Sequence, residues 1–167
     1  NISLQHQLYR DLYKNRKEYG ITFDQTLKII TIVRNPYERI VSDLFWKKLI
    51  DLESTAEEVH DIIQKYAADI STGISLYDNH NLPQFEFVLD RNNDIAHDIT
   101  ILKTESLTEG MRYLGYTDFD HNENINADRP NYYSYLNPDS IRLINRVYSK
   151  DFELFGYNKM GDELTQP

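Results

Sequence analysis

Residues 27–42 of the chain are LKIITIVRNPYERIVS. The first seven form an apolar, β-branched run with little alternation, which is typical of a strand buried on both faces of a parallel sheet. The run stops at Arg34, after which Asn35 suits a helix N-cap and Pro36 suits the first helical position. We therefore predict a strand, a tight turn and a helix that continues to about Ile50.

The remainder of the chain alternates between helical and extended patterns. Leu4, Leu8 and Leu12 recur at helical spacing before Gly20, and Ser54 begins a capping-box pattern with the glutamate three residues later, Glu57. The other predicted elements are the helix that follows this box to 70, a short strand or extended segment at 85–89, a buried strand at 99–102, a helix at 107–114 and a last helix from 138. Such alternation implies an α/β fold, which we expect to have three layers with a central parallel sheet flanked by helices.

Composition narrows the classes of function. A length of 167 residues fits one domain, and 27 acidic against 18 basic side chains give a formal charge of -9. This balance argues against nucleic acid or an anionic membrane as a partner, so any anion must be bound locally. The longest apolar stretches fall far short of the roughly 20 residues that cross a bilayer. The sequence has no cysteine, which removes disulfides, thiolate nucleophiles and cysteine metal sites.

The strand-to-helix junction has the residue types of a phosphate site. Arg34 lies at the carboxyl end of the predicted strand, where open α/β sheets bind their ligands. The amides that begin the next helix favour an anion. A guanidinium can grip phosphate oxygens through two hydrogen bonds, and Ser42, about two helical turns further on, can donate a third. Together these groups predict a phosphate clamp.

The segment VRNPYERIVS, residues 33–42, resembles the 3'-phosphate-binding segment of sulfotransferases that use PAPS (3'-phosphoadenosine 5'-phosphosulfate). The similarity is to the carbohydrate-modifying branch of that family, and it implies that Arg34 and Ser42 hold the 3'-phosphate. Three further stretches resemble the family in the same order, so that the resemblance spans roughly residues 28–157. They are His80 to Gln84, Leu102 to Leu107, and Tyr148 to Tyr157.

The resemblance implies a P-loop-like fold that binds PAPS and transfers a sulfuryl group to a hydroxyl of a carbohydrate or related acceptor, leaving PAP as the product. No metal is required by that scheme. Arg129, in the polar loop before the last helix, is a candidate further contact to the nucleotide, against the alternative of a solvated charge. His6, on the first predicted helix, is the candidate catalytic base, against an exposed polar face. His80 and Gln84 are candidates for the acceptor side, against a turn with only structural duties.

The two clamp residues also have simpler interpretations. Arg34 is within helical reach of Glu38 and could pair with it. Ser42 could bond back to its own helix. Tyrosines at 132, 133 and 135 could pack over an adenine, although loop aromatics more often anchor a loop to the core.

One part of the family pattern does not occur in this sequence. The family also uses an upstream loop, rich in Lys, Gly, Ser and Thr, whose amides cradle the 5'-phosphosulfate. We expect it before Asn1, so that residues 1–167 are a single sulfotransferase domain without its N-terminal strand, loop and helix. Two alternatives stay open: a kinase-like phosphoryl-transfer enzyme and a non-catalytic nucleotide-binding relative. For the compartment, the acidic, cysteine-free composition favours a microbial or viral cytoplasm over the Golgi lumen.

Overall fold

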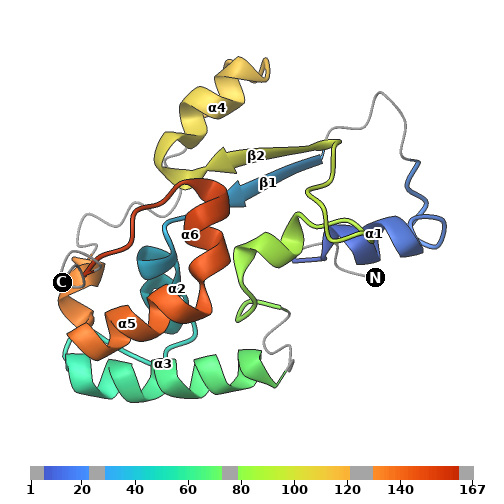
Figure 1. Ribbon diagram of the computed structural model, residues 1–167. Coiled ribbons are helices and arrows are strands. Elements are labelled where there is room, and N and C mark those ends of the chain that lie inside the picture. Colours follow the sequence, from blue (N-terminus) through green and yellow to red (C-terminus); the bar gives the residue numbers. More distant parts are fainter. Residues whose placement is uncertain (1–5, 23–28, 73–78, 121–129, 162–167) are drawn as a thin grey trace, which may run out of the picture. The chain divides into compact units, whose positions relative to one another are not determined.

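The structure is a computed structural model, and it describes residues 6–22, 29–72, 79–120 and 130–161 (Figure 1). The chain divides into two compact units. We call residues 1–33 with 82–121 the strand unit, and residues 34–81 with 122–167 the helical unit. Both units are therefore assembled from segments that are distant in the sequence.

The strand unit contains a small parallel sheet. Strands β1 (Ile29–Val33) and β2 (Ile99–Lys103) pair in parallel, from Ile29 opposite Ile99 to Val33 opposite Lys103, as Figure 1 shows. Just beyond the sheet, the Thr104 hydroxyl donates to the Val33 carbonyl at 3.1 Å. The strands predicted around 27–33 and 99–102 are present, but their predicted burial on both faces is wrong, because among the residues of β1 and β2 only Val33 is buried and Ile32 is 51% exposed. The protein has a mixed α/β fold with a two-stranded parallel sheet in the described residues.

The helical elements of the strand unit are short. They are α1 (Tyr9–Asn15), the 3-10 helices η1 (Gln84–Phe87) and η2 (Thr104–Ser106), and α4 (Leu107–Tyr113). The predicted helix at 107–114 is confirmed, and Gly115 follows it with a φ of 96°, a left-handed conformation that glycine adopts without strain. The α1 helix is held near the start of β2 because the Tyr9 hydroxyl donates to Asp98 at 2.6 Å.

The short strand or extended segment predicted at 85–89 is wrong for residues 85–87. Residues Gln84–Phe87 form a 3-10 helix directly after Pro83, whose φ of -55° suits the start of such a turn. Only Leu89 makes an isolated antiparallel bridge, with Ile95. The turn between them is closed by the Asp90 carboxylate, which accepts from the amides of residues 92 and 94. The alternation of apolar residues alone could not distinguish a short strand from the 3-10 helix that is present.

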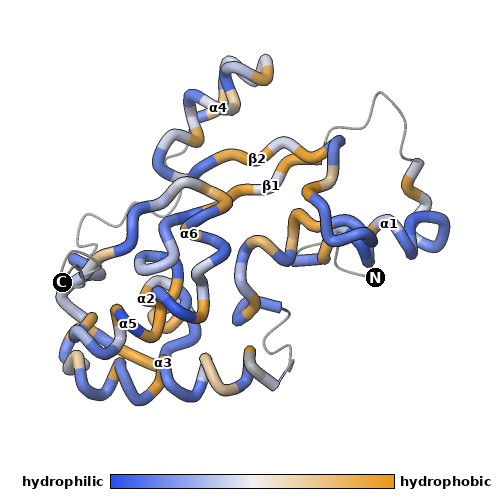
Figure 2. Tube along the Cα trace, viewed as in Figure 1, coloured by the Kyte–Doolittle hydropathy of each residue, from blue (hydrophilic) through white to orange (hydrophobic). Residues whose placement is uncertain are grey.

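The helical unit encloses a hydrophobic core. Its elements are α2 (Pro36–Trp46), α3 (Ala56–Ser71), the 3-10 helix η3 (Tyr132–Tyr135), α5 (Pro138–Val147) and α6 (Ser149–Phe155). Each of the longer helices α2, α3 and α5 carries both apolar and polar stretches, as Figure 2 shows. The apolar faces meet in one cluster, whose most buried members are Tyr37, Val41, Leu44, Val59, Ile63, Ile144 and Phe152.

Local capping explains where these helices begin. The Asn35 side chain accepts the Tyr37 amide at 3.1 Å and Pro36 occupies the first turn, which confirms the predicted start of α2. The α2 helix ends at Trp46, earlier than predicted, and Lys48 then adopts a φ of 56°. The last helix begins at Pro138 as predicted.

The predicted capping box is displaced by one residue. The box is formed by Thr55 and Glu58, with the Glu58 amide donating to the Thr55 hydroxyl at 3.2 Å and the Glu58 carboxylate accepting the Thr55 amide at 2.8 Å. Ser54 is used in the preceding turn, where its hydroxyl accepts the Asp51 amide at 2.9 Å. The start of α3 is therefore one residue later than the pattern of Ser54 and Glu57 predicts.

We expect Tyr148 to make the helical unit less stable as the pH rises into the alkaline range. Its side chain lies at the C-cap of α5 with 4% exposed, and burial raises the pKa of its phenol above the ordinary value of 10.0. Above that value the unfolded chain loses the proton while the folded chain keeps it, so the free energy of unfolding falls as pH rises. We expect Tyr148→Phe to remove this part of the alkaline loss in denaturant titrations run below and above pH 10.

Tyr113→Phe is the matched control, because the Tyr113 ring is 92% exposed. It should leave the pH dependence of unfolding unchanged. An alkaline loss that is the same in Tyr148→Phe as in the wild type would contradict the assignment.

Candidate functional site

The two residues expected to bind phosphate, Arg34 and Ser42, both contact the same tyrosine of the helical unit. Arg34 follows β1 directly in the sequence and precedes the N-cap of α2, while Ser42 lies in the second turn of that helix. The Arg34 Cζ atom is 5.2 Å from the centroid of the Tyr132 ring, and the Tyr132 hydroxyl is 3.5 Å from Ser42 Oγ, at the outer limit of a hydrogen bond. The structure therefore gathers the guanidinium and the serine hydroxyl around Tyr132, which comes from η3.

Glu38 holds the guanidinium in place. Nε and Nη2 of Arg34 donate to one carboxylate oxygen of Glu38, at 3.2 and 3.0 Å. The Tyr133 hydroxyl lies 3.4 Å from the other carboxylate oxygen. The ion pair between Arg34 and Glu38, which was the simpler interpretation of Arg34 from the sequence, is thus present. The Arg34 side chain is 17% exposed and the Glu38 side chain 26%. A phosphate that binds Arg34 has to compete with this carboxylate.

The start of α2 contributes fewer amides to an anion site than the sequence predicts. Pro36 has no N–H, and the Tyr37 amide is accepted by the Asn35 side chain. Glu38 adds a negative charge in the same turn. An anion at this position would therefore depend on the side chains of Arg34 and Ser42 more than on backbone amides.

A second polar cluster surrounds Asp43, the residue after Ser42. One carboxylate oxygen of Asp43 lies 3.0 Å from His80 Nδ1. The other accepts the Tyr66 hydroxyl at 2.9 Å and also binds the Lys47 ammonium. The Lys47 side chain is only 4% exposed, and burial lowers its pKa. Asp43 thus compensates a buried charge and fixes His80 at the same time.

His80 is held from two further directions. Its carbonyl oxygen accepts from Arg39 Nη2 at 2.8 Å. Its ring is stacked on the indole of Trp46, with the centroids 4.9 Å apart and the planes 4° from parallel. The His80 side chain keeps 21% of its surface exposed, and Trp46 is 69% exposed. His80 was predicted from the sequence, whereas Asp43 was expected only as an ion-pair partner of Arg39 and no role was predicted for Trp46.

The other sequence-predicted residues lie elsewhere. Gln84 begins η1 in the strand unit and is 6% exposed, and its role on the acceptor side stays a prediction. His6 is exposed in a turn before α1, with a φ of 57° that an α-helix does not allow, so its expected place on the first helix is wrong. Arg129 falls outside the described residues.

A groove of about 760 Å³ lies between α3 and α5 of the helical unit. His60 stands at its wall, with Nδ1 3.1 Å from the Ser140 hydroxyl and Nε2 2.9 Å from the Gln64 amide nitrogen. The charged members of its lining are Asp139, Arg142 and Arg146. Arg34 and Ser42 are not part of this lining, so the groove is separate from the residues that the sequence motif identifies.

Neither a metal site nor a membrane-spanning helix is found in the described residues. Within residues 6–22, 29–72, 79–120 and 130–161, no three His, Asp or Glu side chains gather as a metal site would require. Among the helices of those same segments, none combines the length and the apolarity needed to cross a membrane.

Comparison of the chain with protein-family models, with curated proteins and with solved structures finds no match.

Proposed function

We propose that this protein binds the 3'-phosphate of PAPS through Arg34 and Ser42, and that it is the nucleotide-binding body of a sulfotransferase with a three-layer, P-loop-like fold. The observation that carries the proposal is the convergence of the guanidinium and the hydroxyl on Tyr132, from positions eight residues apart in the sequence. The two side chains belong to the VRNPYERIVS segment, which resembles the 3'-phosphate-binding segment of sulfotransferases.

The chemistry of these groups fits a phosphate monoester. A guanidinium offers five N–H donors in a planar fork, and the contact with Glu38 uses two of them. A phosphate carries up to two negative charges against one on the carboxylate, so it can replace Glu38 as the partner of Arg34. Glu38 would then turn away from the ligand. Because the chain carries a net charge of -9, its overall charge does not attract an anion. The affinity for the anion comes from the local replacement of Glu38 by phosphate at Arg34.

The reaction class follows from the bound nucleotide. PAPS supplies the sulfuryl group, and a hydroxyl of a carbohydrate or related acceptor receives it. The residues of this chain would contribute by holding the nucleotide in line with the acceptor and by stabilising the charge of the departing phosphate. Arg34 and Ser42 act at the 3'-phosphate, which takes no part in bond breaking, so their effect is on binding and orientation.

The experiment compares two nucleotides that differ only in the 3'-phosphate. Titration calorimetry with PAP and with AMP, on the wild type and on Arg34→Ala, separates this phosphate from the rest of the nucleotide. Loss of one charge-assisted contact of about 1.5–3 kcal/mol should weaken PAP binding roughly 10- to 150-fold and leave AMP binding unchanged.

Arg142→Ala is the matched control, since Arg142 is 70% exposed and pairs with Asp139 within its own helix. It should bind PAP as the wild type does. Equal affinity of the wild type for PAP and AMP would contradict the proposed clamp and would favour a nucleotide-binding protein of another class.

A further inference from the structure

We propose that the groove between α3 and α5 binds an extended acidic segment of a partner protein, in which acidic side chains alternate with small ones. This inference goes beyond the proposed function and does not rest on it, because Arg34, Ser42 and Tyr132 are not part of the groove lining. Both helices belong to the helical unit and lie side by side in it, as Figure 1 shows.

Helical spacing on both walls gives the groove its length. The lining covers positions 60–68 on α3 and 139–147 on α5, at intervals of three and four residues that keep it on one face of each helix. Eight residue steps correspond to about 12 Å of helix axis. The lining on α3 includes Ala67 and Ala68, whose small side chains leave the space open. An extended peptide rises about 3.3 Å per residue, so the groove accommodates about four of its residues.

The α5 wall is cationic, and its charges are accessible. Arg142 and Arg146 are four residues apart, so they leave the helix on the same face with their Cβ atoms about 5–6 Å apart. Arg142 pairs with Asp139, but these side chains are 70% and 63% exposed, and such a surface ion pair is weak enough to be exchanged. Among the described residues, nothing forms an ion pair with Arg146. Two guanidiniums against one carboxylate leave the groove with a net positive charge.

The net charge of -9 on the chain does not exclude an acidic partner at this wall. At physiological ionic strength the Debye length is about 8 Å, so exposed charges further away than this are largely screened. The ligand therefore responds mainly to Arg142, Arg146 and Asp139, which line the groove itself.

The α3 wall offers hydrogen bonds and no large apolar anchor. The Gln64 amide nitrogen donates to His60 Nε2, which leaves its second N–H and its carbonyl oxygen for a ligand. The buried part of the floor consists of Ala67 and Leu143, and the described lining has no phenyl, phenol or indole ring. An amphipathic helix docks through large apolar anchors, whereas an extended peptide offers a backbone amide at each residue. The groove therefore suits the extended peptide better.

The spacing of the two arginines predicts the pattern of the bound segment. In an extended chain, alternate residues point to the same side and are about 6.6 Å apart, close to the separation of Arg142 and Arg146 on α5. Two acidic residues separated by one residue can therefore each meet a guanidinium, which binds a carboxylate through two hydrogen bonds. The residue between them points to the opposite wall, where Ala67 and Ala68 leave room for a small side chain.

Three capped pentapeptides test this register: AEAEA, AAEEA and AQAQA. They are titrated into isotope-labelled protein while the Nε–H signals of Arg142 and Arg146 are followed by NMR. Two charge-assisted contacts predict a Kd for AEAEA of about 1 mM, within a factor of roughly ten. AAEEA has the same charge but directs its carboxylates to opposite sides, so it should bind roughly tenfold more weakly. AQAQA should cause no saturable shift.

Variants separate the charge of the groove from its shape. Arg146→Gln should weaken AEAEA binding about tenfold. Asp139→Asn should strengthen it about two- to fivefold, because Arg142 loses its competing carboxylate. Ala68→Leu changes no charge and narrows the groove at an exposed position, so it should also weaken binding. Arg112→Gln is the matched control, because Arg112 is exposed on α4 of the strand unit, outside the lining, and it should bind AEAEA as the wild type does.

Equal affinity for AEAEA and AAEEA, or the absence of a saturable shift at both arginines, would overturn the proposal. A disulfated heparin disaccharide that displaces AEAEA and binds more tightly would overturn it as well, since the groove would then fit an anionic glycan. The test is independent of the nucleotide clamp: Arg34→Ala should keep the affinity for AEAEA, and AEAEA should leave PAP binding unchanged. Loss of PAP binding alone would contradict only the proposed function.

Discussion

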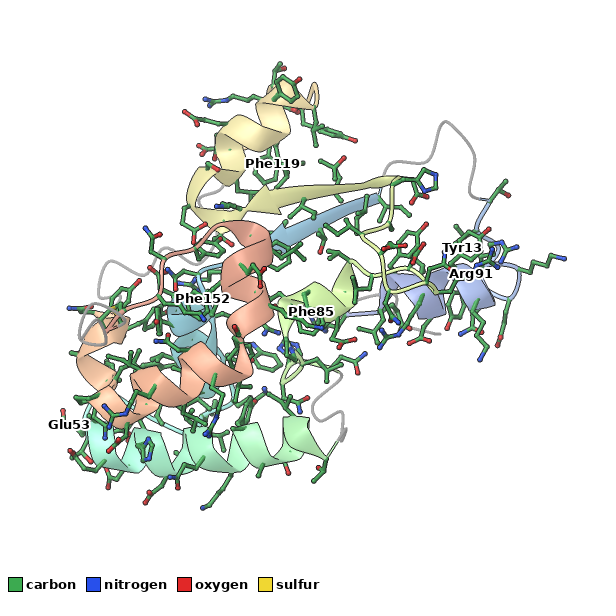
Figure 3. The ribbon with its side chains drawn as sticks, viewed as in Figure 1. Tyr13, Glu53, Phe85, Arg91, Phe119 and Phe152 are labelled. Carbon is green, nitrogen blue, oxygen red and sulfur yellow. The ribbon has the colours of Figure 1, made fainter. Side chains whose placement is uncertain are left out.

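Replacing Phe152 by alanine is expected to lower the free energy of unfolding of the helical unit by about 3–5 kcal/mol. The Phe152 side chain lies in the core with 2% exposed, and its ring centroid is 5.0 Å from that of Tyr37. Figure 3 shows it on α6, the helix that is coloured red in Figure 1. The change removes a large apolar side chain and leaves a cavity that the neighbouring helices fill only in part. Denaturant titration followed by circular dichroism measures the loss.

Leu154→Ala provides the matched comparison on the same helix. Leu154 is 38% exposed, so its truncation should cost about 0.5 kcal/mol or less. Similar small losses for both variants would mean that α6 does not complete the core.

Asp43→Ala is expected to have an effect of the same size for an electrostatic reason. The Lys47 ammonium, 4% exposed, would lose the carboxylate that compensates its charge. Removing one partner of a buried pair costs about 3–5 kcal/mol, because the remaining charge stays desolvated. The loss should be largest at neutral pH and should shrink in alkali, since a deprotonated Lys47 needs no partner. Denaturant titrations at neutral and alkaline pH test both statements.

An exposed pair gives the contrast. Asp139 and Arg142 form an ion pair with 63% and 70% of their side chains exposed, so Asp139→Ala should change stability by about 0.5 kcal/mol or less. Adding Lys47→Met to Asp43→Ala should restore much of the lost stability, because a methionine needs no counter-charge. A double variant as unstable as Asp43→Ala alone would show that the buried charge is not the cause.

Where the fold could be predicted, the signals were local. The run at 27–33 and the pair Asn35 and Pro36 act within a few residues, and they gave a strand and a helix start that are confirmed. The capping box was misplaced because Ser54 with Glu57 and Thr55 with Glu58 both satisfy the pattern. The structure has the box of Thr55 with Glu58, because the Ser54 hydroxyl is engaged in the preceding turn.

In the candidate site, too, the local features could be predicted from the sequence and the contacts between distant residues could not. The motif at 33–42 identified Arg34 at the end of the strand and Ser42 in the helix that follows, eight residues or about two helical turns later. The tyrosine that brings them together, Tyr132, lies 90 residues after Ser42 in the sequence, and no local pattern connects the two. His80 was singled out by a motif, but its contact with Asp43 spans 37 residues and depends on the packing of the helical unit.

The division of the chain has a consequence for its synthesis. Both segments of the strand unit have been synthesised once residue 121 has been made, whereas the helical unit still lacks its second segment. Until α5 and α6 emerge, the apolar faces of α2 and α3 lack the side chains of Leu143, Ile144 and Phe152 that pack against them in the folded core, and they are exposed to the solvent and to chaperones. A nascent chain halted before Pro138 would thus expose these apolar faces and be prone to aggregate.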